Sequence, residues 1–149
     1  MSTSQQTDPL IGRLVDGRYR VRARIARGGM ATVYVATDLR LERRVALKVM
    51  HSHLSDDTVF QGRFIQEARA AARLADPHVV NVFDQGQDGE MAYLVMEYLP
   101  GITLRDLLRE QRRLSIPQTI TIMDAVLSGL AAAHPVSYTH LTLPTKRLE

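Results

Sequence analysis

The sequence predicts an α+β fold: a five-stranded antiparallel sheet with one helix, then a hinge and the first helices of a helical part. Three observations predict this class. Segments with the two-residue alternation of strands recur over residues 19–98, one helical pattern interrupts them after the third segment, and the pattern is wholly helical after Pro100-Gly101. With 45% hydrophobic and 23% charged residues, the composition is that of an ordinary globular chain.

Four regions follow one another: a polar lead-in over 1–16, the strand-rich lobe over 17–99, the hinge and start of the helical part over 100–134, and a tail over 135–149. The lead-in has no apolar core, so it is not a secretory signal peptide. No apolar run approaches the roughly 20 residues that a membrane-spanning helix needs, so we expect no membrane contact in this chain. The lack of cysteine excludes disulfides and thiolate zinc sites.

The first two strands are expected to form a hairpin. From residue 19 to residue 25 apolar side chains alternate with arginines, which is typical of a half-buried strand. Gly28-Gly29 forms the turn, and the second strand covers 32–37. A glycine pair of this kind is more often a plain hairpin turn than a phosphate-binding loop, and the turn alone leaves both open.

The third strand covers 44–50 and has two different faces. Val45, Leu47 and Val49 lie on one face, while Ala46 and Lys48 lie on the other, because successive side chains of a strand alternate. Lys48 is the single lysine expected on the inward side of this strand, beside Ala46.

A helix is expected over 55–74, because the polar and acidic residues at 55–57 favour a helix N-terminus and Asp76-Pro77 ends the pattern. Its predicted core-facing stripe consists of Phe60, Phe64, Glu67, Ala71 and Leu74. Glu67 would be costly to bury without a cation, and Lys48 is the candidate partner. The alternative is that Glu67 lies at the edge of the stripe with its carboxylate in water, and the residues alone favour neither interpretation.

The remaining elements complete the fold class. A fourth strand is expected over 79–83, a turn over 85–90 and a nearly all-apolar, central fifth strand over 91–98. Thr103 caps a short helix, and Ser115 caps a second one over 116–134. This last helix is apolar nearly all round, which is typical of a helix inside a larger domain, so the sequence indicates an incomplete domain.

Two further interpretations are disfavoured. The net charge of +3 raises the question of nucleic acid, but the chain offers no obvious aromatic platform or recognition helix, so we expect no nucleic-acid binding. His51 and His53 lack the third ligand that a zinc site needs, so we expect no metal held by this chain.

The order of these features resembles the protein kinases, most closely the actinobacterial serine/threonine kinases of the Hanks type, over residues 18–134. The segments that carry the resemblance are IARGGMATVY (25–34), DLRLERRVALKVM (38–50), FIQEARAAARL (64–74), YLVMEYLPGITLRDLL (93–108) and GLAAAH (129–134). Their number, order and spacing make the resemblance specific. It implies that 17–99 is the kinase N-lobe and that 100–134 opens a truncated, helical C-lobe.

The resemblance also implies roles for individual residues. Lys48 would contact the α- and β-phosphates of ATP, with Glu67 as its helix partner. The turn that covers the nucleotide would comprise Ile25, Ala26, Gly28 and Gly29. Val33 and Ala46 would lie above the adenine, Met96 behind it, and the backbone of Glu97 and Leu99 along its edge.

The sequence departs from the kinase pattern at the glycine loop. The family has three glycines in G-x-G-x-x-G-x-V, whereas only Gly28 of those three is kept here, and Ala26 and Ala31 replace the outer two. Because alanine lacks the positive-φ freedom of glycine, we expect weaker or slower ATP binding than usual.

A second departure follows His134. The family continues into a catalytic loop and a metal-binding Asp-Phe-Gly motif, but no aspartate follows Asp124 here. Residues 135–149 are interpreted as a non-native tail, because 136–145 match what a transposon-end sequencing adapter would encode; a native strand or loop is the alternative. The Mg²⁺ ligands of the intact protein are therefore expected to be missing.

The resemblance implies a fragment of a serine/threonine protein kinase, whose intact form transfers the γ-phosphoryl group of ATP to protein Ser or Thr with Mg²⁺. We expect the kinase domain in the cytoplasm, with a membrane anchor in a missing C-terminal segment of the parent protein as one arrangement. The alternative function is a nucleotide-binding or pseudokinase module that regulates a partner without catalysis.

Overall fold

The computed structural model describes residues 8–51 and 57–134. The chain forms two compact units, each described here by itself. The first contains the residues up to Arg69 together with Val82–Leu99, and the second contains Ala70–Asn81 and the residues from Pro100 onward. The second unit thus joins the short segment Ala70–Asn81 to the helical residues that follow Leu99.

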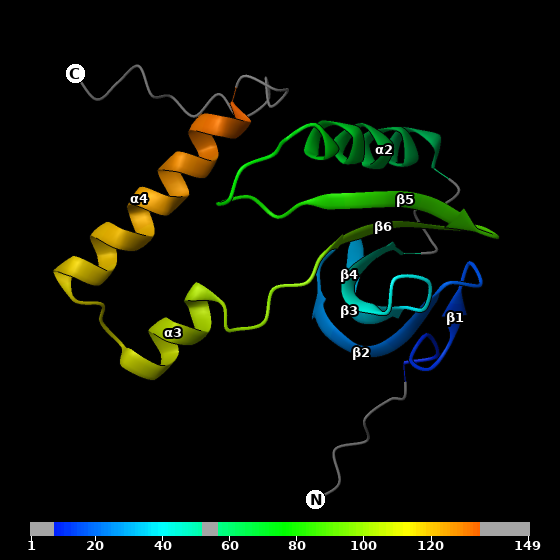
Figure 1. Ribbon diagram of the computed structural model, residues 1–149, viewed down its shortest axis with the longest axis horizontal. Helices are drawn as coiled ribbons and strands as arrows, with labels where there is room; N and C mark the ends of the chain where they lie inside the picture. The colour runs from blue at the N-terminus through cyan, green and yellow to red at the C-terminus, as the bar shows by residue number, and fades with distance from the viewer. Residues whose placement is uncertain (1–7, 52–56, 135–149) are drawn as a thin grey trace, which may run out of the picture. The chain divides into compact units, whose positions relative to one another are not determined.

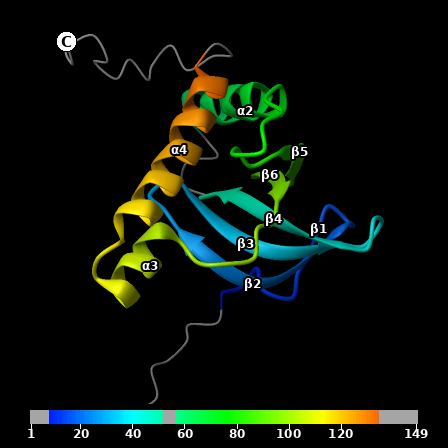
Figure 2. The same cartoon turned by 60° about the vertical axis from the view of Figure 1, so that its left-hand side comes forward.

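The first unit is built on a curled antiparallel sheet (Figure 1). Its strands, in chain order, are β1 (Leu14–Val15), β2 (Tyr19–Arg27), β3 (Ala31–Asp38), β4 (Arg43–Met50), β5 (Val82–Asp88) and β6 (Met91–Glu97). The spatial order is β1-β2-β3-β4-β6-β5, so β6 is an interior strand and β5 forms an edge. Figure 2 shows β2, β3 and β4 side by side. The predicted fold class is confirmed, with the two-residue β1 as an additional strand.

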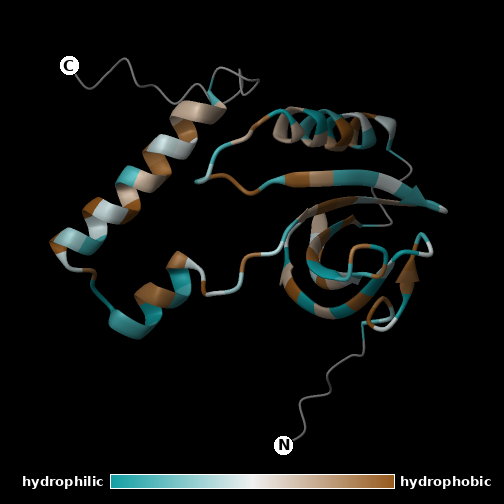
Figure 3. Cartoon of the chain, viewed as in Figure 1, coloured by the Kyte–Doolittle hydropathy of each residue, from teal (hydrophilic) through white to brown (hydrophobic). Residues whose placement is uncertain are grey.

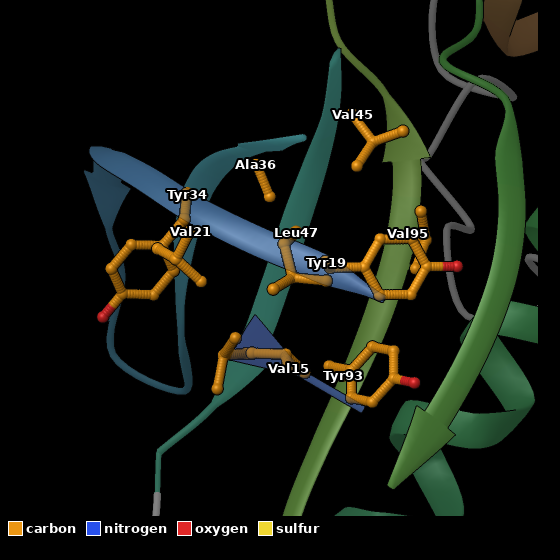
Figure 4. Packing of buried hydrophobic residues seen from close by; sticks show 10 residues of the cluster. Val15, Tyr19, Val21, Tyr34, Ala36, Val45, Leu47, Tyr93 and Val95 are labelled. Carbon is orange, nitrogen blue, oxygen red and sulfur yellow. The ribbon is translucent and has the colours of Figure 1, made fainter. Parts of the chain in front are cut away.

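One face of the sheet holds the main hydrophobic core (Figure 4). The alternation predicted for the third strand is confirmed, since Val45, Leu47 and Val49 all belong to this core. The core residues are Val15, Tyr19, Val21, Tyr34, Ala36, Val45, Leu47, Val49, Tyr93 and Val95. The rings of Tyr19 and Tyr93 meet edge to face with 6.0 Å between their centroids. These β-branched and aromatic side chains suit a pleated, buried surface, so the same residues both form the strands and fill the core.

The residues before β2 are tied onto this core by two tyrosine–carboxylate hydrogen bonds. Tyr34 donates from its hydroxyl to Asp8 over 2.6 Å, and Tyr93 donates to Asp16 over 2.5 Å. Burial raises the pKa of both tyrosines, and the adjacent carboxylate raises it further. The sequence analysis assigned residues 1–16 to a polar lead-in, but Val15, with no exposed surface, is a core residue.

Helix α2 (Thr58–Ala72) packs on one part of the other face of the sheet. Phe64 and Ala68 of this helix pack with Met50 of β4 and Leu94 of β6. The predicted stripe placed Glu67 among the buried residues, and this is wrong, because Glu67 is exposed and Ala68 takes the buried position. The reason is physical: Ala68 lies one turn after Phe64, and burying its methyl group avoids the desolvation of a carboxylate.

The predicted fourth strand at 79–83 is displaced in the structure. β5 runs from Val82 to Asp88 and pairs with β6 up to Asp88↔Met91, so the turn is only Gly89 and Glu90. The expectation of a turn over 85–90 rested on the glycines. Gly86 is instead a strand residue paired with Tyr93. A glycine suits this position because the Tyr93 ring lies where a Cβ would be.

The second unit contains α3 (Leu104–Gln111) and α4 (Ile116–Ala133). Both begin with a capping box, with Thr103 and Ser115 as the N-caps, as predicted. Near its C-terminal end α4 packs against the segment after α2, since a Cβ on the buried Gly129 would lie 3.2 Å from the carbonyl oxygen of His78.

Helix α4 carries bands of hydrophobic residues along its length (Figure 3). Its exposed hydrophobic residues include an apolar stripe on one side of the helix. The stripe consists of Ile116, Ile120, Met123, Leu127 and Leu130, of which Ile116 is 77% exposed. Among the described residues α4 is the one helix that is long and apolar enough to cross a membrane, with a mean hydropathy of 1.3 over its 18 residues. Length and composition alone are weak support for a span, because the core helices of soluble proteins pass the same test.

Candidate nucleotide site

Two rows of paired residues cross the face of the sheet opposite the main core. The first row runs Ala26–Val33–Lys48–Leu94 over β2, β3, β4 and β6. The second runs Ala23–Val35–Ala46–Met96 over the same strands. Directly paired residues of antiparallel strands present their side chains on the same face, about 5 Å apart. The register therefore brings Val33, Ala46, Lys48 and Met96, all predicted site residues, onto one surface.

Lys48 is half-buried in this surface, between Val33 and Leu94. Its neighbours along the rows are aliphatic, and Ala46 is only 6% exposed. A small apolar floor with one lysine matches the two chemical parts of a nucleotide, since an aromatic base can pack on Val33 and Ala46 while the ammonium group reaches an anionic phosphate.

The glycine turn lies at the end of the first row. It is closed by a hydrogen bond from the Gly28 amide to the Ala31 carbonyl over 2.9 Å, and Gly28 and Gly29 are both exposed. The turn therefore has backbone amides next to the strand that carries Lys48, which is the arrangement expected of a phosphate-binding loop.

The loss of ATP affinity expected from Ala26 and Ala31 rested on a need for positive φ, and this conformation does not have that need. Ala26 lies within β2 and Ala31 begins β3, and neither is among the described residues with positive φ. The positive-φ freedom of glycine is not used at these two positions, so alanine is compatible with the loop as it stands.

Glu67 is not paired with Lys48 in this structure. Ion pairs between described residues include Arg18–Asp38 and Asp76–His78, and none joins Glu67 to Lys48. With its carboxylate exposed, Glu67 corresponds to the alternative in which it lies at the edge of the helical stripe.

Met96 ends the second row, and the remaining predicted site residues border the two rows. Met96 is half-buried and packs against the cluster under α2. Glu97 ends β6 and is half-buried, whereas Leu99, in the connection after β6, is 57% exposed. Ile25 is 50% exposed and lies at an irregularity in the β2–β3 pairing, where Arg24 and Ala26, but not Ile25, have partners.

One contact at the turn was not predicted from the sequence. Thr32 Oγ1 and His51 Nε2 are hydrogen-bonded at 2.9 Å, and the His51 amide donates to the Met30 carbonyl over 2.9 Å. From the sequence, His51 stood out only as one of two histidines that lack the third ligand of a zinc site. His53 lies outside the described residues. The alternation of β3 could have signalled the contact, because it turns the polar Thr32 toward a core face.

Comparison with known proteins gives a consistent picture. The protein kinase domain family model matches residues 19–143. Serine/threonine-protein kinase PknL of Mycobacterium tuberculosis is 49% identical over 133 residues, which cover 89% of this chain and 33% of PknL. Serine/threonine-protein kinase PrkC of Bacillus subtilis is 37% identical over 131 residues, covering 88% of this chain and 20% of PrkC. The chain thus spans a third or less of these relatives.

A solved structure agrees with the fold. The crystal structure of the Mycobacterium tuberculosis PknI kinase domain superposes with a TM-score of 0.70 at 28% sequence identity, covering 83% of this chain and 51% of that one. The family match extends past residue 134 to residue 143. The non-native tail predicted over 135–149 lies outside the described residues and stays a prediction.

Proposed function

Because this chain belongs to the protein kinase family, of the serine/threonine type and from the N-terminal part of the domain, we propose that it supplies the ATP-binding part of a protein serine/threonine kinase. The observation that supports this most directly is the register, which aligns Val33, Ala46 and Lys48 on one sheet face beside the glycine turn. Family members use ATP and Mg²⁺ and act on proteins.

In this proposal each group has a distinct task. Val33 and Ala46 receive the adenine, and the backbone of Glu97 and Leu99 pairs with its edge. The amide of Gly29 and the ammonium group of Lys48 hold the phosphates, which places negative charge where the chain offers donors. Bound Mg-ATP would supply the phosphoryl group, and proteins with Ser or Thr would accept it.

Location and partners follow from the same family. We propose that the domain works in the cytoplasm, where ATP and protein substrates are available, and that an anchor elsewhere in the intact protein ties it to the plasma membrane. This chain itself is proposed to contact neither membrane nor nucleic acid.

The test is a titration of the chain with a fluorescent ATP analogue. Lys48→Met should weaken binding by at least about tenfold, because a hydrogen bond between charged groups is lost. Arg44→Met is the matched control, since Arg44 lies on the same strand and face as Lys48, four residues earlier. Equal losses in both variants would indicate non-specific charge attraction and contradict the proposal.

A regulatory, non-catalytic nucleotide-binding module is the second candidate, and the exposed Glu67 is the observation that favours it. For a kinase we propose that Glu67 pairs with Lys48 once nucleotide is bound. Glu67→Gln should then weaken ATP binding, whereas a module that never forms the pair should bind ATP equally well with either residue.

A further inference from the structure

A hydrogen bond between the side chains of Thr32 and His51 lies next to the glycine turn. Thr32 is paired with Val49, a residue of the main core, so its side chain lies on the face opposite Lys48. Thr32 is 6% exposed, and its hydroxyl is 2.9 Å from Nε2 of the half-buried His51. The two side chains are therefore hydrogen-bonded to each other on the side of the sheet where no nucleotide would lie.

The backbone of His51 holds the same turn. Strand pairing between β3 and β4 ends at Ala31↔Met50, and the His51 amide extends it by one further bond, to the carbonyl of Met30. His51 thus contacts the turn on both sides of Ala31, once through its backbone and once through its ring. Because His51 directly follows the strand of Lys48, these two bonds connect the turn to the strand that carries the lysine.

We propose that His51 is a positioning residue for phosphate binding, acting through Thr32. The inference rests on the proposed nucleotide site and adds to it a residue that touches no part of the ligand. Gly28, Gly29 and Met30 are exposed, with Met30 57% exposed, so the turn has few packing contacts to hold it. A turn that is already fixed loses less conformational freedom when it binds phosphates, and this makes binding tighter.

The prediction concerns one part of the nucleotide. The hydrogen bond between Thr32 and His51, called the tether below, orders the turn. The turn contacts phosphates, whereas adenosine would rest on Val33 and Ala46. Loss of the imidazole–hydroxyl bond should weaken ATP binding about three- to tenfold, the range expected for one hydrogen bond, and leave adenosine affinity unchanged. General destabilisation of the lobe would instead weaken both ligands together.

The experiment measures ATP and adenosine affinities of the whole chain by calorimetry. His51→Leu and Thr32→Val should each lose ATP affinity selectively, and the double variant should lose no more than either single one. Since His51 has a further interaction besides the one with Thr32, Thr32→Val isolates the bond in question. His51→Gln and Thr32→Ser, which keep a hydrogen-bonding group near each position, should bind ATP as the original chain does.

The outcomes separate the two proposals. If the original chain binds neither ATP nor adenosine, the proposed function is contradicted, and the tether is contradicted with it. If the original chain binds both, then unchanged ATP affinity in Thr32→Val, or equal loss of both ligands, contradicts the tether alone. Should His51→Leu fail to fold, the ATP and adenosine affinities of Thr32→Val and His51→Gln still decide whether the tether acts on phosphate binding.

Discussion

The carboxylate of Asp38 accepts four hydrogen bonds although its side chain is only 1% exposed. Two come from the guanidinium of Arg18, at 3.0 and 2.8 Å, and two from the backbone amides of Arg40 and Leu41. The residue therefore fixes the turn between β3 and β4 and joins it to the start of β2. Arg18, which directly precedes β2, is half-buried and paired.

Asp38→Asn should lower the free energy of unfolding by about 3 kcal/mol, because the buried carboxylate that accepts four hydrogen bonds loses its charge and the half-buried Arg18 guanidinium loses its ionic partner. Urea unfolding at neutral pH measures the effect. Asp124→Asn, at an exposed position of α4, is the control and should change little. Equal small changes in both variants would mean that the ion pair contributes no net stability.

The pH dependence of this pair has a definite sign. The hydrogen bond from Arg18 holds the pKa of Asp38 below its ordinary value of 3.8. The stabilisation is therefore complete above that value and is lost as the pH falls through the folded-state pKa. The stability difference between the original chain and Asp38→Asn should accordingly shrink as the pH falls below about 4.

The position of Lys48 could be predicted from the sequence, whereas the position of Glu67 could not. The strand alternation assigned Lys48 to the face opposite Val45 and Leu47, and the structure has it there. Glu67 could not be placed equally well, because positions 67 and 68 are neighbours on a helix and both lie near the Phe64 row. Which of the two is buried depends on the sheet beneath, which helical spacing does not encode.

At the scale of elements, Gly86 shows how one strand pairing limits side-chain size. A Cβ on Gly86 would lie 2.3 Å from the Tyr93 hydroxyl oxygen. That hydroxyl is itself held by Asp16, whose backbone amide bonds to Asp88 of β5. The tyrosine therefore cannot move aside without breaking the contacts that tie β1, β5 and β6 together.

Gly86→Ala should destabilise the first unit by about 2–4 kcal/mol, because the clash is with an anchored ring and relief disrupts a hydrogen bond to a carboxylate. Gly29→Ala is the matched control, since a Cβ there meets nothing within 4 Å. Thermal unfolding of both variants measures the difference. A tolerated Gly86→Ala would mean that Tyr93 has another position available.

The glycine turn provides a prediction opposite to the one that the family pattern suggests. Ala26 and Ala31 adopt strand conformations, so replacing either with glycine adds unfolded-state freedom without relieving strain. Each change should cost about 0.5–1 kcal/mol of stability and should not tighten nucleotide binding. Titration with a fluorescent nucleotide checks this; tighter binding would restore the expectation that alanines impair the loop.

Element boundaries were predictable where caps or alternation mark them. Thr103 and Ser115 cap the N-termini of α3 and α4 with their side chains, so both helix starts were predicted correctly. Strand β5 was predicted to start at residue 79 and not at Val82, and its continuation to Asp88 was missed because the polar sequence after Phe83 resembles a loop. Its strand conformation comes from pairing with β6, which is a tertiary effect.

At the scale of the whole molecule, the apolar stripe on α4 predicts association in solution. Ile120 and Leu127 are 63% and 58% exposed and lie two turns apart on one side of the helix. A contiguous exposed apolar surface promotes self-association. Size-exclusion chromatography should show species larger than a monomer. A double variant, Ile120→Lys with Leu127→Lys, should shift the chain toward monomer, whereas Thr121→Lys, on a polar side of α4, should not.

The last prediction is that the 149-residue polypeptide transfers no phosphoryl group, even if it binds ATP. Phosphoryl transfer depends on positioning and on electrostatic stabilisation, which in kinases come from a catalytic aspartate and from magnesium held by a second aspartate and an asparagine. No aspartate follows Asp124 in this sequence, whereas Lys48 is present, so the chain has groups that bind phosphates and lacks those that move one. Labelled ATP with a generic protein substrate should give no more transfer than the Lys48→Met variant. Transfer above that control by a monodisperse monomer would mean that the described lobe and α4 suffice for catalysis, and that the sequence is not a fragment of the active domain.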